Sequence, residues 1–208
     1  MTKPIDKSLR ETITKSDLAT VITDLGEIGV DSLLDDGVLK DIPILGSVLK
    51  IGKTFGTVRD YYLAKKILAF LNELSDLPQI ERDKLISKLE NDKKYESSVG
   101  GQLLELLSRI DEESKPTLIA KAFKLYVQEE INYMELQRVT YAIERFQVCD
   151  IDEFRKFASE EETDRITDEK DSTANFINSG LGYAASGYGA GGVHPTETAK
   201  ILIMILDS

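Results

Sequence analysis

Apolar residues recur every three or four positions along most of the chain, which is the spacing of helices with one buried face. The longest pattern of this kind covers residues 43–74, where Pro43 suits the first turn of a helix. Its apolar positions form two stripes, which are Ile44, Val48, Ile51, Phe55, Val58 and Tyr62, and then Leu63, Ile67, Phe70 and Leu74. The pattern predicts a buried helical segment in a mainly α protein.

Shorter segments with the same spacing and recognisable start signals predict further helices. They begin at Ser16-Asp17, cover 28–34, 79–89, 99–110, 117–127 and 134–146, and end with a short helix after Asp150. In the segment 134–146, the residues predicted to face inward are Leu136, Val139, Ile143 and Phe146. These segments together predict a multi-helix bundle over residues 16–158, preceded by an N-terminal extension at 1–15.

The chain after the predicted bundle changes character. Residues 159–171 are polar and rich in acidic groups, which predicts a solvated linker. A short helix that Gly180 ends, a hairpin at 181–193 with a glycine-rich turn, and a last helix capped by Thr196 then predict a compact α+β unit at 172–208.

This last unit resembles the ending of winged-helix domains, in which a hairpin is followed by a helix. The matching residues cover about 30 positions and are Gly180, Leu181, Thr196, Ala199, Lys200 and Leu202. The resemblance implies a hairpin packed on helices, and it makes a nucleic-acid-binding regulator one alternative function.

Glycines at positions 46, 52 and 56 interrupt the longest apolar segment, although glycine destabilises a helix interior by up to about 1 kcal/mol relative to alanine. They predict either close approach of another helix or a break near Gly56. The favoured interpretation is a helical hairpin in the core, and the alternative is an amphipathic element that lies on a membrane. The candidate interaction residues are Ile44, Val48, Ile51, Gly52, Phe55 and Gly56.

The net charge of the chain and its distribution limit the classes of function that the sequence supports. The 208 residues include 26 basic and 37 acidic side chains, which give a formal net charge of −11. Residues 1–75 are nearly neutral, whereas the last 58 residues carry an acidic excess. Extended contact with a phosphate backbone depends on clustered Lys and Arg, so this balance argues against nucleic-acid binding.

Chemical groups for catalysis or metal binding are scarce in the sequence. A single cysteine and a single histidine exclude an internal disulfide and metal centres built from two histidines. Cys149 and His194 could form a nucleophile–base pair, but we expect Cys149 to be a buried structural thiol. Residues 187–192 match G-x-G-x-x-G without the strand and helix that a dinucleotide site needs, which favours a hairpin tip. We therefore predict no catalytic residue, cofactor or metal ion.

The function expected from these observations is non-enzymatic. The residues around 35–43 and 65–71 resemble bacterial helical proteins to which no activity is attached, so the resemblance implies no site. We expect a cytoplasmic protein that works through protein–protein interaction or self-association, with no small-molecule substrate. The alternative is an effector or regulator in stress or phage defence that acts at the membrane surface through residues 43–74. Neither a secretory signal nor a transmembrane helix is predicted.

Overall fold

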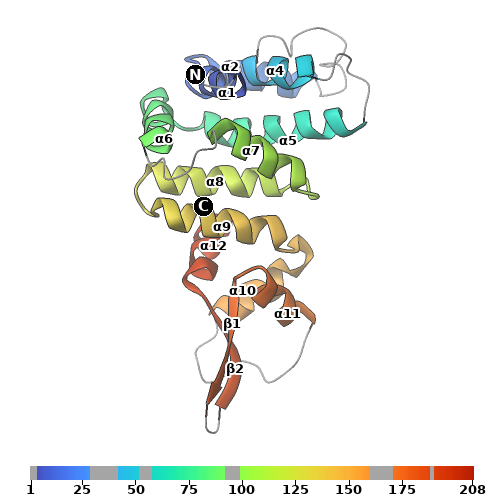
Figure 1. Ribbon diagram of the computed structural model, residues 1–208, viewed down its shortest axis with the longest axis vertical. Coiled ribbons are helices and arrows are strands. Elements are labelled where there is room, and N and C mark those ends of the chain that lie inside the picture. Colours follow the sequence, from blue (N-terminus) through green and yellow to red (C-terminus); the bar gives the residue numbers. More distant parts are fainter. Residues whose placement is uncertain (1–3, 29–41, 52–57, 92–98, 160–170, 188–189) are drawn as a thin grey trace. The chain divides into compact units, whose positions relative to one another are not determined.

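The computed structural model describes residues 4–28, 42–51, 58–91, 99–159, 171–187 and 190–208 (Figure 1). Within these residues the chain forms eleven α-helices and one two-stranded antiparallel sheet near the carboxyl end. The predicted mainly α fold with a small C-terminal hairpin is therefore confirmed.

Contacts divide the chain into two compact units, Met1–Glu130 and Ile131–Ser208, so the predicted bundle at 16–158 includes parts of both. Most of the acidic linker predicted at 159–171 lies outside the described residues. Its role as a linker stays a prediction.

All regular elements among the described residues of the first unit are helices. It contains α1 (Pro4–Ile13), α2 (Leu18–Ile28), α4 (Pro43–Ile51), α5 (Val58–Ser75), α6 (Gln79–Asn91), α7 (Val99–Arg109) and α8 (Lys115–Val127). Helix α5 packs against α2, α7 and α8, so it occupies the middle of this unit (Figure 1). Its buried side chains include Ile67, Phe70 and Leu74, and the ring of Phe70 meets Phe123 of α8 edge to face at 5.6 Å between centroids. Burial of each such side chain stabilises the fold by about 1.5–3 kcal/mol.

Helix α1 lies against α4, and it supplies both apolar and polar contacts. Leu9 and Ile13 are buried. The buried hydroxyl of Thr12 donates to the carbonyl of Ser8 at 2.7 Å and accepts from the amide of Ile44 at 3.0 Å. That amide lies in the first turn of α4 and has no acceptor within its own helix. The segment that the sequence sets apart as an extension therefore contributes to the core and caps α4.

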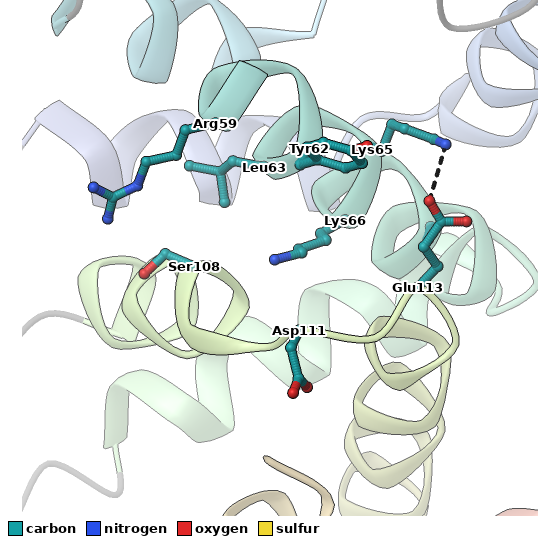
Figure 2. Close-up of a pocket in the computed structure, with 9 residues that line it drawn as sticks. Arg59, Tyr62, Leu63, Lys65, Lys66, Ser108, Asp111 and Glu113 are labelled. Carbon is teal, nitrogen blue, oxygen red and sulfur yellow. Dashed lines mark hydrogen bonds and ion pairs between the residues drawn. The ribbon is translucent and has the colours of Figure 1, made fainter. Parts of the chain in front are cut away.

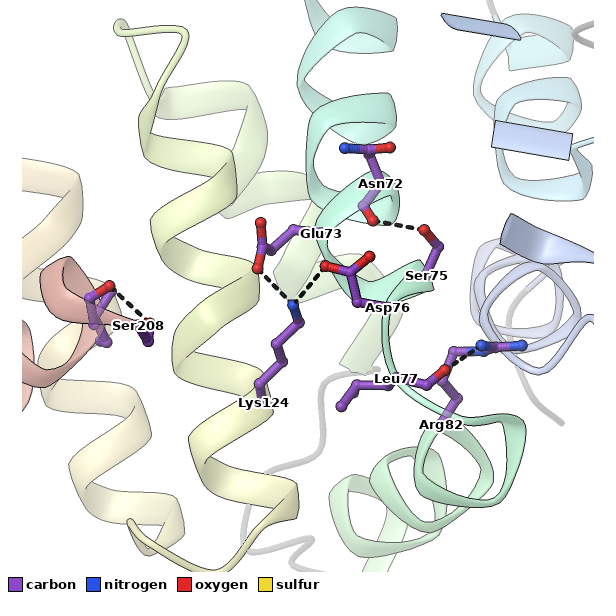
Figure 3. Close-up of polar contacts among 9 residues, drawn as sticks. Asn72, Glu73, Ser75, Asp76, Leu77, Arg82, Lys124 and Ser208 are labelled. Carbon is purple, nitrogen blue, oxygen red and sulfur yellow. Dashed lines mark hydrogen bonds and ion pairs between the residues drawn. The ribbon is translucent and has the colours of Figure 1, made fainter. Parts of the chain in front are cut away.

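A buried arginine joins the end of α1 to the turn between α5 and α6. Nε of Arg82 donates to the carbonyl of Ile13 at 2.8 Å, and Nη2 donates to the carbonyl of Lys15 at 2.8 Å. Nη1 donates to the carbonyl of Leu77, as Figure 3 shows. Arg82 is 4% exposed, and burial lowers the pKa of its guanidinium group. Carbonyl oxygens thus replace water around this charge, at a helix end where a cation is favourable.

A second polar link joins α8 to the last turn of α5. The amino group of Lys124 lies between the carboxylates of Glu73 and Asp76 (Figure 3). The Lys124 and Glu73 side chains are only 18% and 17% exposed, so this pair is shielded from solvent more than an ordinary surface ion pair.

The second unit combines helices with the hairpin. It contains α9 (Tyr133–Arg145), a 3₁₀ turn (Val148–Asp150), α10 (Ile151–Ser159), α11 (Asp171–Asn178), β1 (Gly182–Gly187), β2 (Ala190–Pro195) and α12 (Glu197–Asp207). Helix α12 packs against α9, α10 and β2 through buried Ala199, Leu202 and Ile205. Four phenylalanine rings from α10, α11 and the end of α9 form an aromatic cluster in the core, namely Phe146, Phe154, Phe157 and Phe176.

The ends of the elements in this unit follow from local chemistry. Asn132 and Glu135 form a reciprocal capping box at the start of α9. Gly180 has φ of 78°, which a glycine adopts without steric cost, and Leu181 then donates to the carbonyl of Phe176 at 2.8 Å. The hydroxyl of Thr196 accepts from the amide of Ala199 at the start of α12. The predictions that Gly180 ends a helix and that Thr196 caps the last one are confirmed.

The hairpin is short and in regular register. Strands β1 and β2 pair antiparallel, with Gly182 opposite Pro195 and Gly187 opposite Ala190. The residues that match G-x-G-x-x-G belong to this hairpin, apart from 188–189, which lie outside the described residues.

Candidate binding surfaces

The predicted interaction segment at 43–74 forms two helices on either side of residues 52–57, which lie outside the described part of the chain. Ile44 is buried at 0% exposure, so it can meet a partner only if α4 leaves the core. A side-chain carbon at Gly46 would have no described atom within 4 Å, which gives no support there for the expected close helix crossing. The remaining candidate interaction residues lie outside the described residues, or have side chains that do, and are Val48, Ile51, Gly52, Phe55 and Gly56.

The exposed part of this segment is the start of α5. Val58 is 74% exposed and Tyr62 is 47% exposed, and their spacing of four residues places them on one side of the helix. Arg59 is exposed between them in sequence. The apolar stripe predicted from the sequence is therefore buried at Ile44 and open to solvent at Val58 and Tyr62.

A hollow of about 540 Å³ adjoins this exposed turn, between α5 and the end of α7 (Figure 2). Its described lining residues are Arg59, Tyr62, Leu63, Lys65, Lys66, Ala69, Ser108, Asp111 and Glu113. The α5 side chains supply an apolar wall through Tyr62, Leu63 and Ala69. This volume falls in the range of sites that hold small molecules.

The two carboxylates around the hollow are engaged by lysines. Glu113 pairs with Lys65 at 3.2 Å, and this hydrogen bond raises the pKa of Lys65. Asp111 accepts a hydrogen bond from Lys115 at 3.1 Å, which lowers the pKa of Asp111. In Figure 2 the carboxylate of Asp111 points away from α5, and that of Glu113 turns toward Lys65.

Lys66 differs from Lys65 in its partners. Its amino group donates to the backbone carbonyl of Ile110, and no carboxylate of the described residues lies within ion-pair distance of it. Desolvation lowers the pKa of Lys66, and the more distant charge of Asp111 opposes this only in part. The hollow therefore contains a half-buried cation whose hydrogen-bonded partner is neutral.

The second candidate surface is the exposed face of α9. Four residues at spacings of four, three and four project from this face, namely Met134, Arg138, Tyr141 and Arg145. Met134 is 50% exposed and Tyr141 is 48% exposed. The guanidinium carbon of Arg145 lies 4.4 Å from the centre of the Tyr141 ring, a cation–π contact that holds both side chains in place.

An open hollow of about 600 Å³ borders this row. Gln137, Arg138 and Tyr141 form its α9 side, and the turn after α11 and the start of α12 form the other, with Gly180 and Thr196. The backbone under it is fixed by the glycine turn and the threonine cap described above. The row and the hollow make one continuous surface within the second unit.

Cys149 and His194 lie on different elements, the 3₁₀ turn before α10 and strand β2. Cys149 is exposed, so the expectation of a buried thiol is wrong, because the 3₁₀ turn before α10 directs residue 149 to solvent. His194 lies on β2 opposite Tyr183, and their rings are 5.5 Å apart. Among the described residues, no group of three or more His, Cys, Asp and Glu side chains could hold a metal ion.

Among the residues that the structure describes, no helix is long and apolar enough to cross a membrane.

Comparison with known proteins identified no similar protein. No family model matches the chain, and no curated protein or solved structure matches it either.

Sequence reasoning found the α9 helix but not its exposed face. The inward residues Leu136, Val139, Ile143 and Phe146 are buried as predicted. The signal for the opposite face was available, because a helix with a fixed core stripe also has a fixed solvent stripe. Reading that stripe for tyrosine, arginine and methionine would have identified the surface.

Proposed function

We propose that this protein is a non-enzymatic binding protein that contacts a partner protein through the exposed face of α9. The observation that carries the proposal is the row of Met134, Arg138, Tyr141 and Arg145 beside an open hollow. Tyrosine, arginine and methionine are enriched where proteins meet, and tyrosine and arginine dominate the binding energy. A cytoplasmic location and a bacterial type of protein stay predictions from the sequence.

The charge of the row indicates the chemistry of the partner. Two arginines flank Tyr141 on the exposed face, in a chain whose net charge is −11. A complementary partner offers carboxylates to Arg138 and Arg145, together with an apolar side chain that enters the hollow next to Tyr141. The contact between Arg145 and Tyr141 supports such binding, because side chains that are already ordered lose less entropy on association.

The proposal predicts that crosslinking from this face depends on Tyr141 and Arg138. A photoreactive amino acid at Met134 should capture a discrete protein partner, and Tyr141→Ala with Arg138→Glu should reduce the capture about tenfold or more, because central aromatic and arginine contacts contribute at least 1–2 kcal/mol each. The yield of the crosslinked band on a gel measures this effect.

The matched control places the same photoreactive group at Ile80, which is 82% exposed on α6. Capture from Ile80 should not yield the same band. A band that persists in the double variant, or that appears equally from both positions, contradicts the proposal. Light scattering of the purified chain distinguishes self-association, in which the partner is a second copy.

A membrane-surface function is the second candidate, and the exposed start of α5 favours it. Val58 and Tyr62 project next to Arg59, which combines apolar contact with attraction to anionic lipid. If this function holds, the protein should co-sediment with vesicles that contain phosphatidylserine, and Val58→Glu with Tyr62→Glu should abolish co-sedimentation. Ile80→Glu is the matched control and should have no effect. Absence of co-sedimentation by the unchanged protein contradicts this function.

Nucleic-acid binding, which the winged-helix resemblance implies, is the function with the least support. The order of α11, β1, β2 and α12 is compatible with it. However, α11 has the sequence DSTANFIN and contains no lysine or arginine. A helix that enters a DNA groove depends on such residues for phosphate contacts, so nucleic-acid binding is not proposed.

A further inference from the structure

We propose that the hollow between α5 and α7 binds a small organic acid, with its carboxylate at Lys66 and its apolar body against Tyr62, Leu63 and Ala69. This site lies within Met1–Glu130, whereas the α9 surface lies within Ile131–Ser208. The inference therefore stands independently of the proposed protein partner.

The charged side chains around the hollow do not all pair with one another. Lys65 and Glu113 neutralise each other at 3.2 Å, and Asp111 is bound by Lys115 and turned away from α5 (Figure 2). Lys66 and Arg59 remain, and neither pairs with a carboxylate among the residues that the structure describes. The uncompensated charge facing the hollow is thus positive.

The position of Lys66 suits an anionic ligand. Its side chain is half-buried, and its amino group extends into the space between α5 and α7 (Figure 2). Only one of its three N–H groups has a described acceptor, the carbonyl of Ile110. A charged amino group that has lost part of its hydration gains most from an anionic acceptor, because charge-assisted hydrogen bonds are about twice as strong as neutral ones.

The apolar wall of the hollow favours a ligand with an apolar body. Tyr62, Leu63 and Ala69 line the hollow on the α5 side, next to the cationic end. An inorganic anion would leave this wall in contact with water, whereas an acid with an apolar body covers it. The volume of about 540 Å³ accommodates a molecule of this kind. The cationic end at Lys66 and the apolar wall together favour a monocarboxylate with an aromatic or aliphatic body over phosphate or sulfate.

Titration calorimetry with 3-phenylpropionate tests the proposal on the full chain. The neutral 3-phenyl-1-propanol and inorganic phosphate serve as the two comparison ligands. We expect 3-phenylpropionate to bind, and both comparison ligands to bind at least about tenfold more weakly, because each lacks either the charge or the apolar body. Equal binding of the alcohol, or the absence of a heat of binding with 3-phenylpropionate, overturns the proposal.

Two variants with a matched control locate the site. Lys66→Met keeps the apolar stem but removes the charge, and it should weaken binding of 3-phenylpropionate about tenfold or more. Lys84→Met is the matched control, because Lys84 is an exposed lysine of α6 that pairs with Glu129 at 2.8 Å and does not line the hollow, and it should change the affinity less than about threefold.

Arg59→Gln provides a second measurement at an exposed position, where the substitution leaves the core unchanged. It should also weaken binding, by less than Lys66→Met does. Unchanged affinity in both Lys66→Met and Arg59→Gln contradicts the proposed site even if the acid binds elsewhere.

Discussion

Replacing Arg82 with methionine is expected to lower the free energy of unfolding by about 3 kcal/mol or more. The buried guanidinium group donates to the carbonyls of Ile13, Lys15 and Leu77, and methionine fills the volume of the stem without donating to any of them. Each carbonyl left buried without a donor costs about 1–3 kcal/mol, and the end of α1 also loses its nearby cation. Urea denaturation followed by circular dichroism measures the loss.

Two further variants separate the contribution of these hydrogen bonds to the free energy of unfolding from the contributions of charge and packing. Arg82→Lys retains the charge but reaches fewer carbonyls, so its effect should be intermediate. Arg109→Met removes an arginine whose side chain is 49% exposed and pairs with Glu105, and it should change the free energy of unfolding by less than about 1 kcal/mol. If Arg82→Met is as mild as Arg109→Met, the three hydrogen bonds do not stabilise the fold as argued.

Helix α6 shows why apolar spacing predicts helices better than it predicts burial. The sequence predicts a helix at 79–89, and the structure has one at Gln79–Asn91. Ile80 is nevertheless 82% exposed in it, while Arg82 is 4% exposed. Arginine is buried here because carbonyls at the end of α1 and in the turn before α6 need donors. Those carbonyls belong to residues up to 69 positions away, so no local pattern contains this information.

The N-terminal residues illustrate a second limit of the pattern. Ile5, Leu9 and Ile13 recur every four residues within 4–13, yet this short segment is assigned to an extension from the sequence alone. In the structure Leu9 and Ile13 are buried and Thr12 caps α4 through the amide of Ile44. Helix α1 is held by packing against α4, α6 and α7, which is a tertiary property that a ten-residue pattern does not contain.

The candidate surfaces were predicted to different degrees. The sequence predicts an interaction segment at residues 43–74, and Val58 and Tyr62 within it are exposed. The hollow next to them also needs Ser108 of α7 and Asp111 from the turn after α7, which the packing of α7 on α5 brings close. The α9 row needed only the solvent side of a helix that was predicted correctly, so it could have been found from the sequence.

The aromatic core of the second unit yields the other large expected effect. Phe154 is 0% exposed, and its ring lies 5.3 Å from that of Phe146, 5.5 Å from Phe176 and 6.5 Å from Phe157, measured between centroids. These rings join the end of α9, α10 and α11 into one core. Phe154→Ala should therefore lower the free energy of unfolding by about 3–5 kcal/mol, because it removes a buried ring and leaves a cavity that its neighbours fill only in part.

Hydrogen exchange of the amides in Ile131–Ser208 locates this effect, and two controls define its origin. Lys156→Ala changes an exposed side chain on the same helix and should alter the free energy of unfolding by no more than about 0.5 kcal/mol. Phe154→Leu keeps an apolar side chain and most of the volume, so it should cost less than Phe154→Ala. A loss below about 1 kcal/mol for Phe154→Ala would mean that the four rings do not form a packed core. The backbone beneath the α9 surface would then have to be held by α12 and the caps at Asn132 and Thr196 alone.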